Sequence, residues 1–151
     1  MNNEINAEGQ PIRQLIEQEA ELIRSKNVNA LMPFYAEDLL SFDVVDPLEY
    51  SGTDSVKQRM ESWFSSFEGS IGINIRDLNI TVAGNVAFCH CLRNVDATNI
   101  NGNKLNMWWR ETTCFRKIES KWLITHRHSS VPFNTENGQA SMNLKPLNEI
   151  N

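Results

Sequence analysis

A change in the spacing of apolar residues near residue 71 restricts the fold more than any other feature of the chain. Before it, apolar side chains recur at helical intervals. After it they alternate with polar ones in four segments, at residues 71–82, 86–100, 104–118 and 121–133. Tight turns separate these segments, and the Asn101-Gly102 pair is a strong hairpin signal. Helices followed by sequentially joined strands indicate an α+β domain: N-terminal helices packed on a strongly curved, mostly antiparallel sheet that forms a cone with an internal pocket.

Three helical segments are expected before this change. The first begins at Pro11, which suits a first helical position, and carries one apolar stripe formed by Ile12, Leu15, Ile16, Leu22 and Ile23. A short helix is predicted over residues 27–38, and a strand and turn over 39–47. The third helix is predicted over 51–67, with Thr53 as its N-cap.

The chain length of 151 residues fits one domain. We expect that domain at residues 11–133, with flexible polar tails at 1–10 and 134–151. The net charge of −5 and the lack of a Lys or Arg run argue against a nucleic-acid partner. We expect no membrane association, because no apolar stretch could span a bilayer and the polar N-terminus does not resemble a signal peptide.

Cysteine and histidine residues give no pattern typical of a metal site. Cys89, Cys91 and Cys114 are odd in number and lie in predicted strands, so we expect small buried side chains in a reducing cytoplasm. His126 and His128 alternate on one strand, but no cysteine pair stands at zinc-finger spacing. The sequence therefore predicts no metal.

Two carboxylates stand where apolar residues are expected. Glu19 falls near the centre of the first helical stripe, and a charge there must be paired, protonated or open to a watery cavity. Asp43 lies between Phe42 and Val44 in a strand-like run, whereas the nearby Asp46 is explained by the turn before Pro47. Both carboxylates indicate a polar pocket.

The block from Tyr35 to Gly52, "YAEDLLSFDVVDPLEYSG", resembles the corresponding part of ketosteroid isomerases without a gap. Those enzymes carry a similar aromatic-Ala-x-Asp, then an Asp before the next turn, then Ser-Gly at the third helix. The ending "KWLITHRHSSVPF" resembles the last strand of SnoaL-like proteins and of kinase association domains. Over residues 11–133 the chain thus resembles the SnoaL-like and ketosteroid isomerase-like proteins of the nuclear transport factor 2-like superfamily, which implies a cystatin-like α+β cone.

This resemblance also implies candidate catalytic residues. Steroid isomerases of the family use an Asp base, with a Tyr and a protonated Asp holding the oxyanion. By position, the base falls on Asp43, the Tyr at or near Glu19, and the protonated Asp near Glu111. Only Asp43 keeps the residue type, so the steroid reaction does not transfer directly. The implied chemistry is acid–base catalysis without a cofactor.

Strand alternation suggests which other residues line the pocket. If Glu111 faces inward, Trp109 and Thr113 do too, while Arg110 faces outward. On the last strand, Trp122, Ile124, His126 and His128 should share one face, opposite Thr125, Arg127 and Ser129. Clustered carboxylates need cations, for which the candidates are Arg93, Arg110, Arg127, His126 and His128. The candidate ligand-binding residues are Trp63, Trp109, Thr113, His126, His128 and Tyr35.

Two functions remain open from the sequence. The first is an isomerase, cyclase or dehydratase that acts on a small apolar, oxygen-bearing molecule. The second is a non-catalytic ligand-binding or self-association module, because one fold can host many functions. The resemblance further implies a homodimer formed through the outer face of the sheet.

Overall fold

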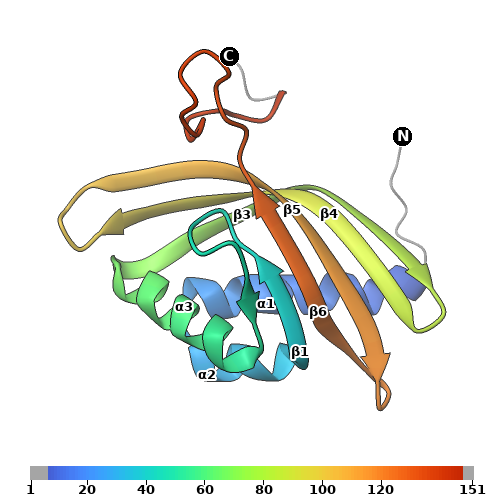
Figure 1. Cartoon of the computed structure of the whole chain (residues 1–151). Helices are drawn as coiled ribbons and strands as arrows, with labels where there is room; N and C mark the ends of the chain where they lie inside the picture. Colours follow the sequence, from blue (N-terminus) through green and yellow to red (C-terminus); the bar gives the residue numbers. More distant parts are fainter. Residues whose placement is uncertain (1–6, 148–151) are drawn as a thin grey trace.

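A computed structural model describes residues 7–147, which form helices on the concave side of a bent sheet (Figure 1). The helices are η1 (Ala7–Gly9), α1 (Gln10–Arg24), α2 (Val28–Leu31), η2 (Met32–Phe34) and α3 (Thr53–Ser65). The strands are β1 (Tyr35–Phe42), β2 (Tyr50–Ser51), β3 (Phe67–Ala83), β4 (Val86–Asn99), β5 (Lys104–Ile118) and β6 (Lys121–Ser130). The predicted α+β class is confirmed.

The sheet has the strand order β2-β1-β6-β5-β4-β3. Neighbouring strands run antiparallel, except that β1 and β6 run parallel. Strands β3 to β6 follow one another through the short turns that the sequence predicts, so each pairs with the next. These long strands bend over α1, α2 and α3 and enclose the core (Figure 1).

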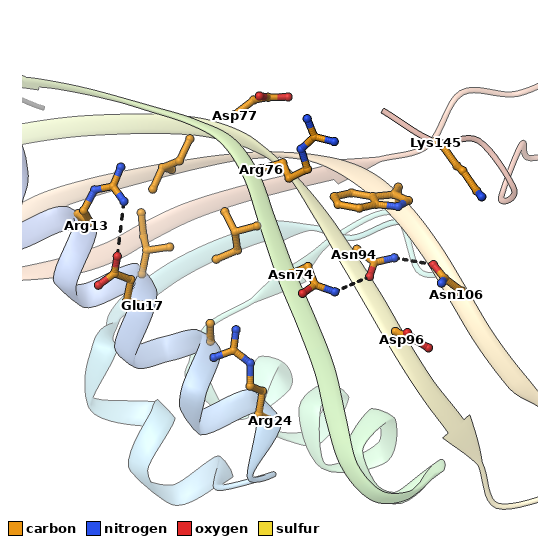
Figure 2. Close-up of a pocket in the computed structure, with 15 residues that line it drawn as sticks. Arg13, Glu17, Arg24, Asn74, Arg76, Asp77, Asn94, Asp96, Asn106 and Lys145 are labelled. Atoms are coloured by element: carbon orange, nitrogen blue, oxygen red, sulfur yellow. Dashed lines mark hydrogen bonds and ion pairs between the residues drawn. The ribbon is translucent and has the colours of Figure 1, made fainter. Parts of the chain in front are cut away.

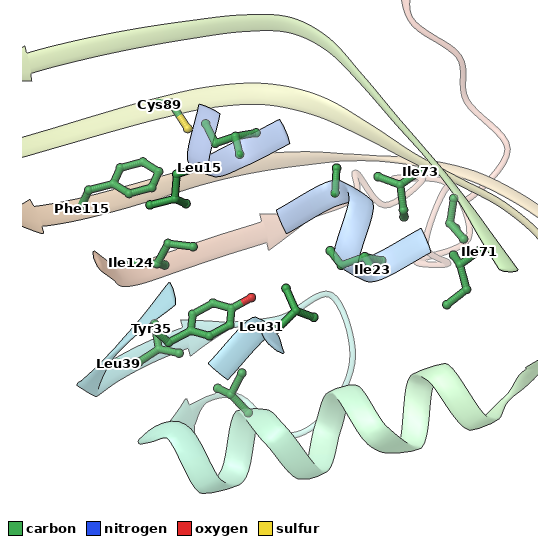
Figure 3. Close-up of a cluster of buried hydrophobic side chains, with 14 of the residues drawn as sticks. Leu15, Ile23, Leu31, Tyr35, Leu39, Ile71, Ile73, Cys89, Phe115 and Ile124 are labelled. Carbon is green, nitrogen blue, oxygen red and sulfur yellow. The ribbon is translucent and has the colours of Figure 1, made fainter. Parts of the chain in front are cut away.

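The core fills the space between the helices and the concave face of the sheet (Figure 3). Ile12 and Ile16 of the α1 stripe are fully buried, as are Phe115 on β5 and Ile124 on β6. Each such side chain contributes about 1.5–3 kcal/mol by leaving water. Within this apolar set the α1 stripe also buries Glu19, with 0% of its surface exposed.

The second predicted helix is too long, because Tyr35 to Asp38 belong to strand β1. Tyr35 pairs with Ile124 across the parallel β1–β6 contact. Pairing with a strand so distant in sequence overrides the local helical pattern. Tyr35 nevertheless points inward and is buried, as expected.

The third helix also differs at both ends from the expected limits. Gly52, with φ of 81°, is its N-cap, so Thr53 is the first helical residue instead of the cap. A positive φ suits glycine, which has no Cβ to clash. At the other end, Phe67 begins strand β3 instead of ending the helix.

A β-bulge in strand β6 changes which side chains face the interior. Phe115 pairs with Ile124 but Cys114 pairs with His126, so Thr125 is an extra residue. Ile124 and Arg127 therefore both point inward, while His126 and His128 lie on the outer face. The expected grouping of Ile124 with the two histidines is wrong, because the bulge shifts the alternation by one residue.

Residues 133–147 form a loop after β6. An isolated bridge joins Phe133 to Ala140, and the backbone N–H of Ser141 donates to the carbonyl of Pro132 at 2.7 Å. Of the tails expected to be flexible, residues 1–6 and 148–151 lie outside the described part of the chain. Within residues 7–147, no helix has the length and apolar content needed to cross a membrane.

Candidate functional site

A cavity of about 560 Å³ lies between helix α3, strand β1 with the loop that follows it, and the concave face of the sheet. Its volume is typical of small-molecule sites. Most of its wall is apolar and includes Leu39, Met60, Trp63, Val95, Leu105 and Met107. Charged side chains line it in two places: Arg93, Glu111 and Arg127 at the sheet, and Asp43, Asp46 and Arg59 near the end of strand β1.

Four charged side chains meet at the sheet side of the cavity, and we call Glu19, Arg93, Glu111 and Arg127 the charge quartet. All are buried except Arg127, whose side chain is 12% exposed. Glu19 Oε1 lies 2.8 Å from Arg93 Nη2, and Glu19 Oε2 lies 2.8 Å from Arg127 Nη1. Glu111 Oε1 lies 3.1 Å from Arg93 Nε and 3.2 Å from Arg127 Nε. Each carboxylate thus contacts both guanidinium groups, and the four charges balance.

The arginines keep Glu19 ionised inside the protein. Burial alone would raise the pKa of Glu19, but the charges of Arg127 and Arg93 outweigh burial and lower it from 4.5 to about 2. Burial would likewise lower the pKa of Arg127, yet the charges of Glu111 and Glu19 hold it well above its ordinary value. The cations that the buried carboxylates require are therefore Arg93 and Arg127.

Three neutral side chains hydrogen-bond to the charge quartet. Tyr35 Oη donates to Glu19 Oε2 at 2.8 Å, and Trp109 Nε1 donates to Glu111 Oε2 at 3.0 Å. Arg127 Nε donates to Thr113 Oγ1 at 3.2 Å. Arg93 Nε is close to Glu111 but off the hydrogen-bond direction, so among the described residues it is a buried nitrogen without an aligned acceptor.

Asp43 lies at the more exposed end of the same cavity. Its Oδ2 accepts from Arg59 Nε at 3.0 Å, and its Oδ1 accepts from the backbone N–H of Val44 at 2.6 Å. The side chains of Asp43 and Arg59 are each 22% exposed. These contacts fix the carboxylate on the cavity wall while leaving part of it open.

Most of the expected site residues meet at this cavity. Asp43, Glu111, Trp63, Trp109 and Tyr35 line it. Glu19 and Thr113 lie behind the wall, and both contact Arg127. Helix α1 positions Glu19, helix α3 positions Trp63, and strand β5 positions Trp109, Glu111 and Thr113. Tyr35 begins strand β1, and Asp43 directly follows its end.

His126 and His128, which we expected at the pocket, do not line the cavity. The bulge in β6 places both on the outer face of the sheet instead. His126 Nδ1 lies 2.8 Å from the carbonyl oxygen of Leu40, and both rings meet the ring of Phe42 edge-on at the outer face. Arg110 also points outward, where its Nε donates to Ser130 Oγ at 3.1 Å. Among residues 7–147, no group of three His, Cys, Asp or Glu side chains is placed to hold a metal ion.

Arg59 and Met142 are among the residues of the cavity that were missed from the sequence. Arg59 had a usable signal, because its position between Val56, Met60 and Trp63 puts it on the inward stripe of helix α3. Met142 had none, since it lies in the loop after β6, where the sequence shows no periodic pattern.

A second hollow, of about 860 Å³, lies beside the edge strand β3 and is more polar (Figure 2). A row of amides crosses the sheet there: Asn74 donates to Asn94 at 2.9 Å, and Asn94 donates to Asn106 at 2.7 Å. Arg13 pairs with Glu17 on helix α1. The wall of this second hollow is more polar than that of the first cavity. We therefore take the first cavity as the candidate ligand site.

Solved structures share this fold along most of the chain. A nuclear transport factor 2-like protein of unknown function from Pseudomonas putida KT2440 is 26% identical, with a TM-score of 0.83 over 93% of this chain and 97% of that one. A ketosteroid isomerase-like protein from Erwinia carotovora atroseptica is 17% identical, with a TM-score of 0.71 over 83% and 97%. The association domain of C. elegans CaMKII is 14% identical, with a TM-score of 0.65 over 82% and 95%.

At such low identities the last two likenesses show the fold alone. No curated protein is significantly similar to the chain. The SnoaL-like domain family, however, matches residues 12–134, which include every residue of the charge quartet as well as Asp43 and Arg59. The chain therefore belongs to the SnoaL-like domain family.

Proposed function

We propose that the cavity binds a small apolar, oxygen-bearing organic molecule and that Asp43 transfers a proton of this molecule without a cofactor. The reaction class is that of an isomerase, cyclase or dehydratase. The observation that carries the proposal is the position of the Asp43 carboxylate, which is fixed on the wall of a mainly apolar cavity and partly open to it. A general base must be held within reach of the proton that it removes.

The residues around Asp43 support this role. Arg59 and the Val44 amide each donate to one carboxylate oxygen, so the group is oriented by two contacts. The apolar walls exclude water from a bound molecule, which strengthens electrostatic interactions inside the cavity. Glu111 also lines the cavity, while Glu19 acts through its contacts with the two arginines.

The test is exchange of carbon-bound hydrogen for deuterium. A panel of enolisable apolar ketones is incubated in D2O with the protein, and loss of the proton signal is followed by NMR. We expect exchange with the unchanged protein and a fall of at least about 100-fold in Asp43→Asn. Glu49→Gln, on the same loop but exposed and away from the cavity wall, is the control. Equal exchange by Asp43→Asn would show that the proposed base is wrong.

A second candidate is a non-catalytic ligand-binding or self-association module. The observation in its favour is that the charge quartet uses two donors that line the cavity with Asp43: the Tyr35 hydroxyl donates to Glu19, and the Trp109 indole to Glu111. Ligand binding without any exchange, in both the unchanged protein and Asp43→Asn, would support this function over the enzyme.

We also propose a homodimer through the outer face of the sheet. Phe88, which is 45% exposed, pairs with Cys114 there, and Trp108 lies on the same face of strand β5, where it pairs with Asn94. Val86, which is 52% exposed, lies on the same face of β4, and adjoining exposed apolar side chains favour contact with a second copy. Light scattering at micromolar concentration should give twice the chain mass, and Phe88→Asp should give the mass of one chain. A monomeric mass for the unchanged protein would contradict the dimer.

A further inference from the structure

A third hollow, of about 280 Å³, lies on the outer face of the sheet, which is the face turned away from the helices. Cross-strand pairing builds it: His90 on β4, Thr112 on β5 and His128 on β6 form one row of directly opposite residues. Arg110 and Ser130 pair in the next row on the same face. All five side chains line the hollow, which therefore collects hydrogen-bond donors from a guanidinium, two imidazoles and two hydroxyls.

The Arg110 guanidinium is the permanent positive charge of this hollow. Its Nε donates to the Ser130 hydroxyl at 3.1 Å, which uses one of the five N–H donors of the arginine on a neutral acceptor. Arg116 lies on the same strand and the same face, but its Nη2 donates to both carboxylate oxygens of Asp38, at 2.8 and 2.9 Å. The charge of Arg116 is thus balanced within the chain, whereas Arg110 can donate to a negatively charged ligand.

Two histidines stand on either side of the middle of the hollow. Neighbouring strands lie about 4.8 Å apart, so His90 and His128 are about 10 Å apart, with the Thr112 hydroxyl between them. The His128 ring is held edge-on against the ring of Phe42, with ring centres 5.4 Å apart. Imidazoles on both sides of a hydroxyl can donate to one small ion that lies above it. With the Arg110 guanidinium, the donors reach this ion from three sides.

The charges around the hollow favour an anion more strongly as the pH falls. Asp77, in the bulge of β3, lines the hollow and places one carboxylate against the charge of Arg110. Glu111 also lines it, but its carboxylate pairs with the two arginines of the charge quartet. Histidine side chains gain positive charge between about pH 8 and 5, so the two imidazoles then make the hollow positive. The charged and titratable side chains on or beside its outer surface are Arg76 and Asp77 of β3, His90 of β4, Arg110 of β5, and His126 and His128 of β6.

We infer that this hollow binds a small tetrahedral oxyanion, a phosphate or sulfate group, through Arg110, Thr112 and the two imidazoles. A planar carboxylate is satisfied by an arginine fork alone, whereas donors on three sides suit a tetrahedral group. The site is independent of the proposed enzyme, because its donors lie on the opposite face of the sheet from Asp43. It lies between Phe88 and Trp108 on the face proposed for the dimer, yet every donor belongs to one chain.

Titration with sodium sulfate, followed by proton NMR of the histidine rings, tests this site. The chain has three histidines, and the variants His90→Gln and His128→Gln assign their ring signals. Sulfate keeps its double negative charge at about pH 5.5 and about pH 8, so the protein alone determines any difference between the two. Sodium chloride holds the ionic strength constant throughout. Arg110→Gln removes the fixed charge, and Arg116→Gln, from the same strand and face, is the matched control.

We expect the signals of His90 and His128 to shift with a saturable dependence on sulfate. The signal of His126 should shift least, because its Nδ1 is bonded to the backbone of β1 outside the hollow. Sulfate should bind about tenfold or more tightly at about pH 5.5 than at about pH 8. At the lower pH, Arg110→Gln should weaken binding about tenfold or more, and Arg116→Gln should leave the Kd unchanged.

Shifts that grow without saturation, or that are equal for all three histidines, would reveal a general effect of salt and overturn the inference. It would also be wrong if Arg110→Gln binds sulfate as the unchanged protein does, if the Kd is the same at both pH values, or if acetate binds as tightly as sulfate. Phosphate and phenyl phosphate then distinguish two sources of the same group. Tighter binding of phenyl phosphate would assign the hollow to a phosphate monoester, and equal binding would assign it to the free ion.

Discussion

Replacing Glu19 by Gln tests whether the charge quartet is a balanced ionic unit. The side chain is fully buried, and its two oxygens accept from Tyr35, Arg93 and Arg127. Glutamine keeps the shape but removes one negative charge, and its amide NH2 must face donors that previously met an acceptor. The variant therefore leaves two buried guanidinium groups with a single carboxylate, that of Glu111.

The expected cost follows from the pKa of Glu19. Its lowering from 4.5 to about 2 corresponds to about 3 kcal/mol in favour of the charged form in the folded protein. Removing one partner of a buried ion pair costs about 3–5 kcal/mol, which agrees with the value from the pKa of Glu19. Domains are stable by about 5–15 kcal/mol, so the variant should remain folded but lose much of its stability. Its Tm should fall by about 10 °C.

Urea denaturation followed by circular dichroism measures the effect on the free energy of unfolding. The matched control is Glu17→Gln on the same helix, whose partner Arg13 lies 3.5 Å away at the surface, and it should cost less than about 1 kcal/mol. If Glu19→Gln shifts the denaturation midpoint no more than Glu17→Gln does, the quartet does not act as an ionic unit and the reasoning fails.

The pH dependence supplies an independent check. Because the folded-state pKa of Glu19 is depressed, its stabilisation is present above pH 4.5 and is lost as the pH falls towards 2. The stability of the unchanged protein should drop in that window by about 3 kcal/mol more than the stability of Glu19→Gln. Parallel curves for the two proteins would contradict the pKa assignment.

Three further predictions concern stability and reactivity. Tyr35→Phe should cost about 1.5–3 kcal/mol in urea denaturation, because it removes a hydrogen bond to the buried Glu19 carboxylate; a neutral effect would contradict that bond. Gly72→Ala should cost about 1–3 kcal/mol, since its Cβ would lie 2.5 Å from the backbone oxygen of Asp96, whereas the exposed Ser70→Ala is a near-neutral control. Burial raises the pKa of Cys89 to about 12 and of Cys91 to about 11, so iodoacetamide at pH 8 should label neither thiol before unfolding, as mass spectrometry can show.

The fold could be predicted because its main signals are local. The alternation of the last four segments and the Asn101-Gly102 turn determine sequential antiparallel strands. The start of strand β1 could not be predicted, because Tyr35 is extended only through its pairing with Ile124 on β6. A contact between positions so distant in sequence leaves no trace in the local pattern around Tyr35.

The site was predictable in part for a similar reason. Glu19 interrupts an apolar stripe, and that interruption correctly indicates a buried polar cluster on the inner side of helix α1. The identity of its partners depended on strand β6, where the extra residue Thr125 turns Arg127 inward and His126 outward. A bulge of one residue reverses the alternation, and no turn residue marks this one.

The balanced charge quartet has a consequence for how related sequences can diverge. A change of Glu19 alone, or of one arginine alone, leaves a buried charge without a partner, and only a second change can restore neutrality. Glu19, Arg93, Glu111 and Arg127 come from helix α1 and three different strands, yet we expect them to be inherited as a set. Relatives that carry an apolar residue at the position of Glu19 should therefore also lack one of the two arginines, and their cavities should differ in polarity on that side.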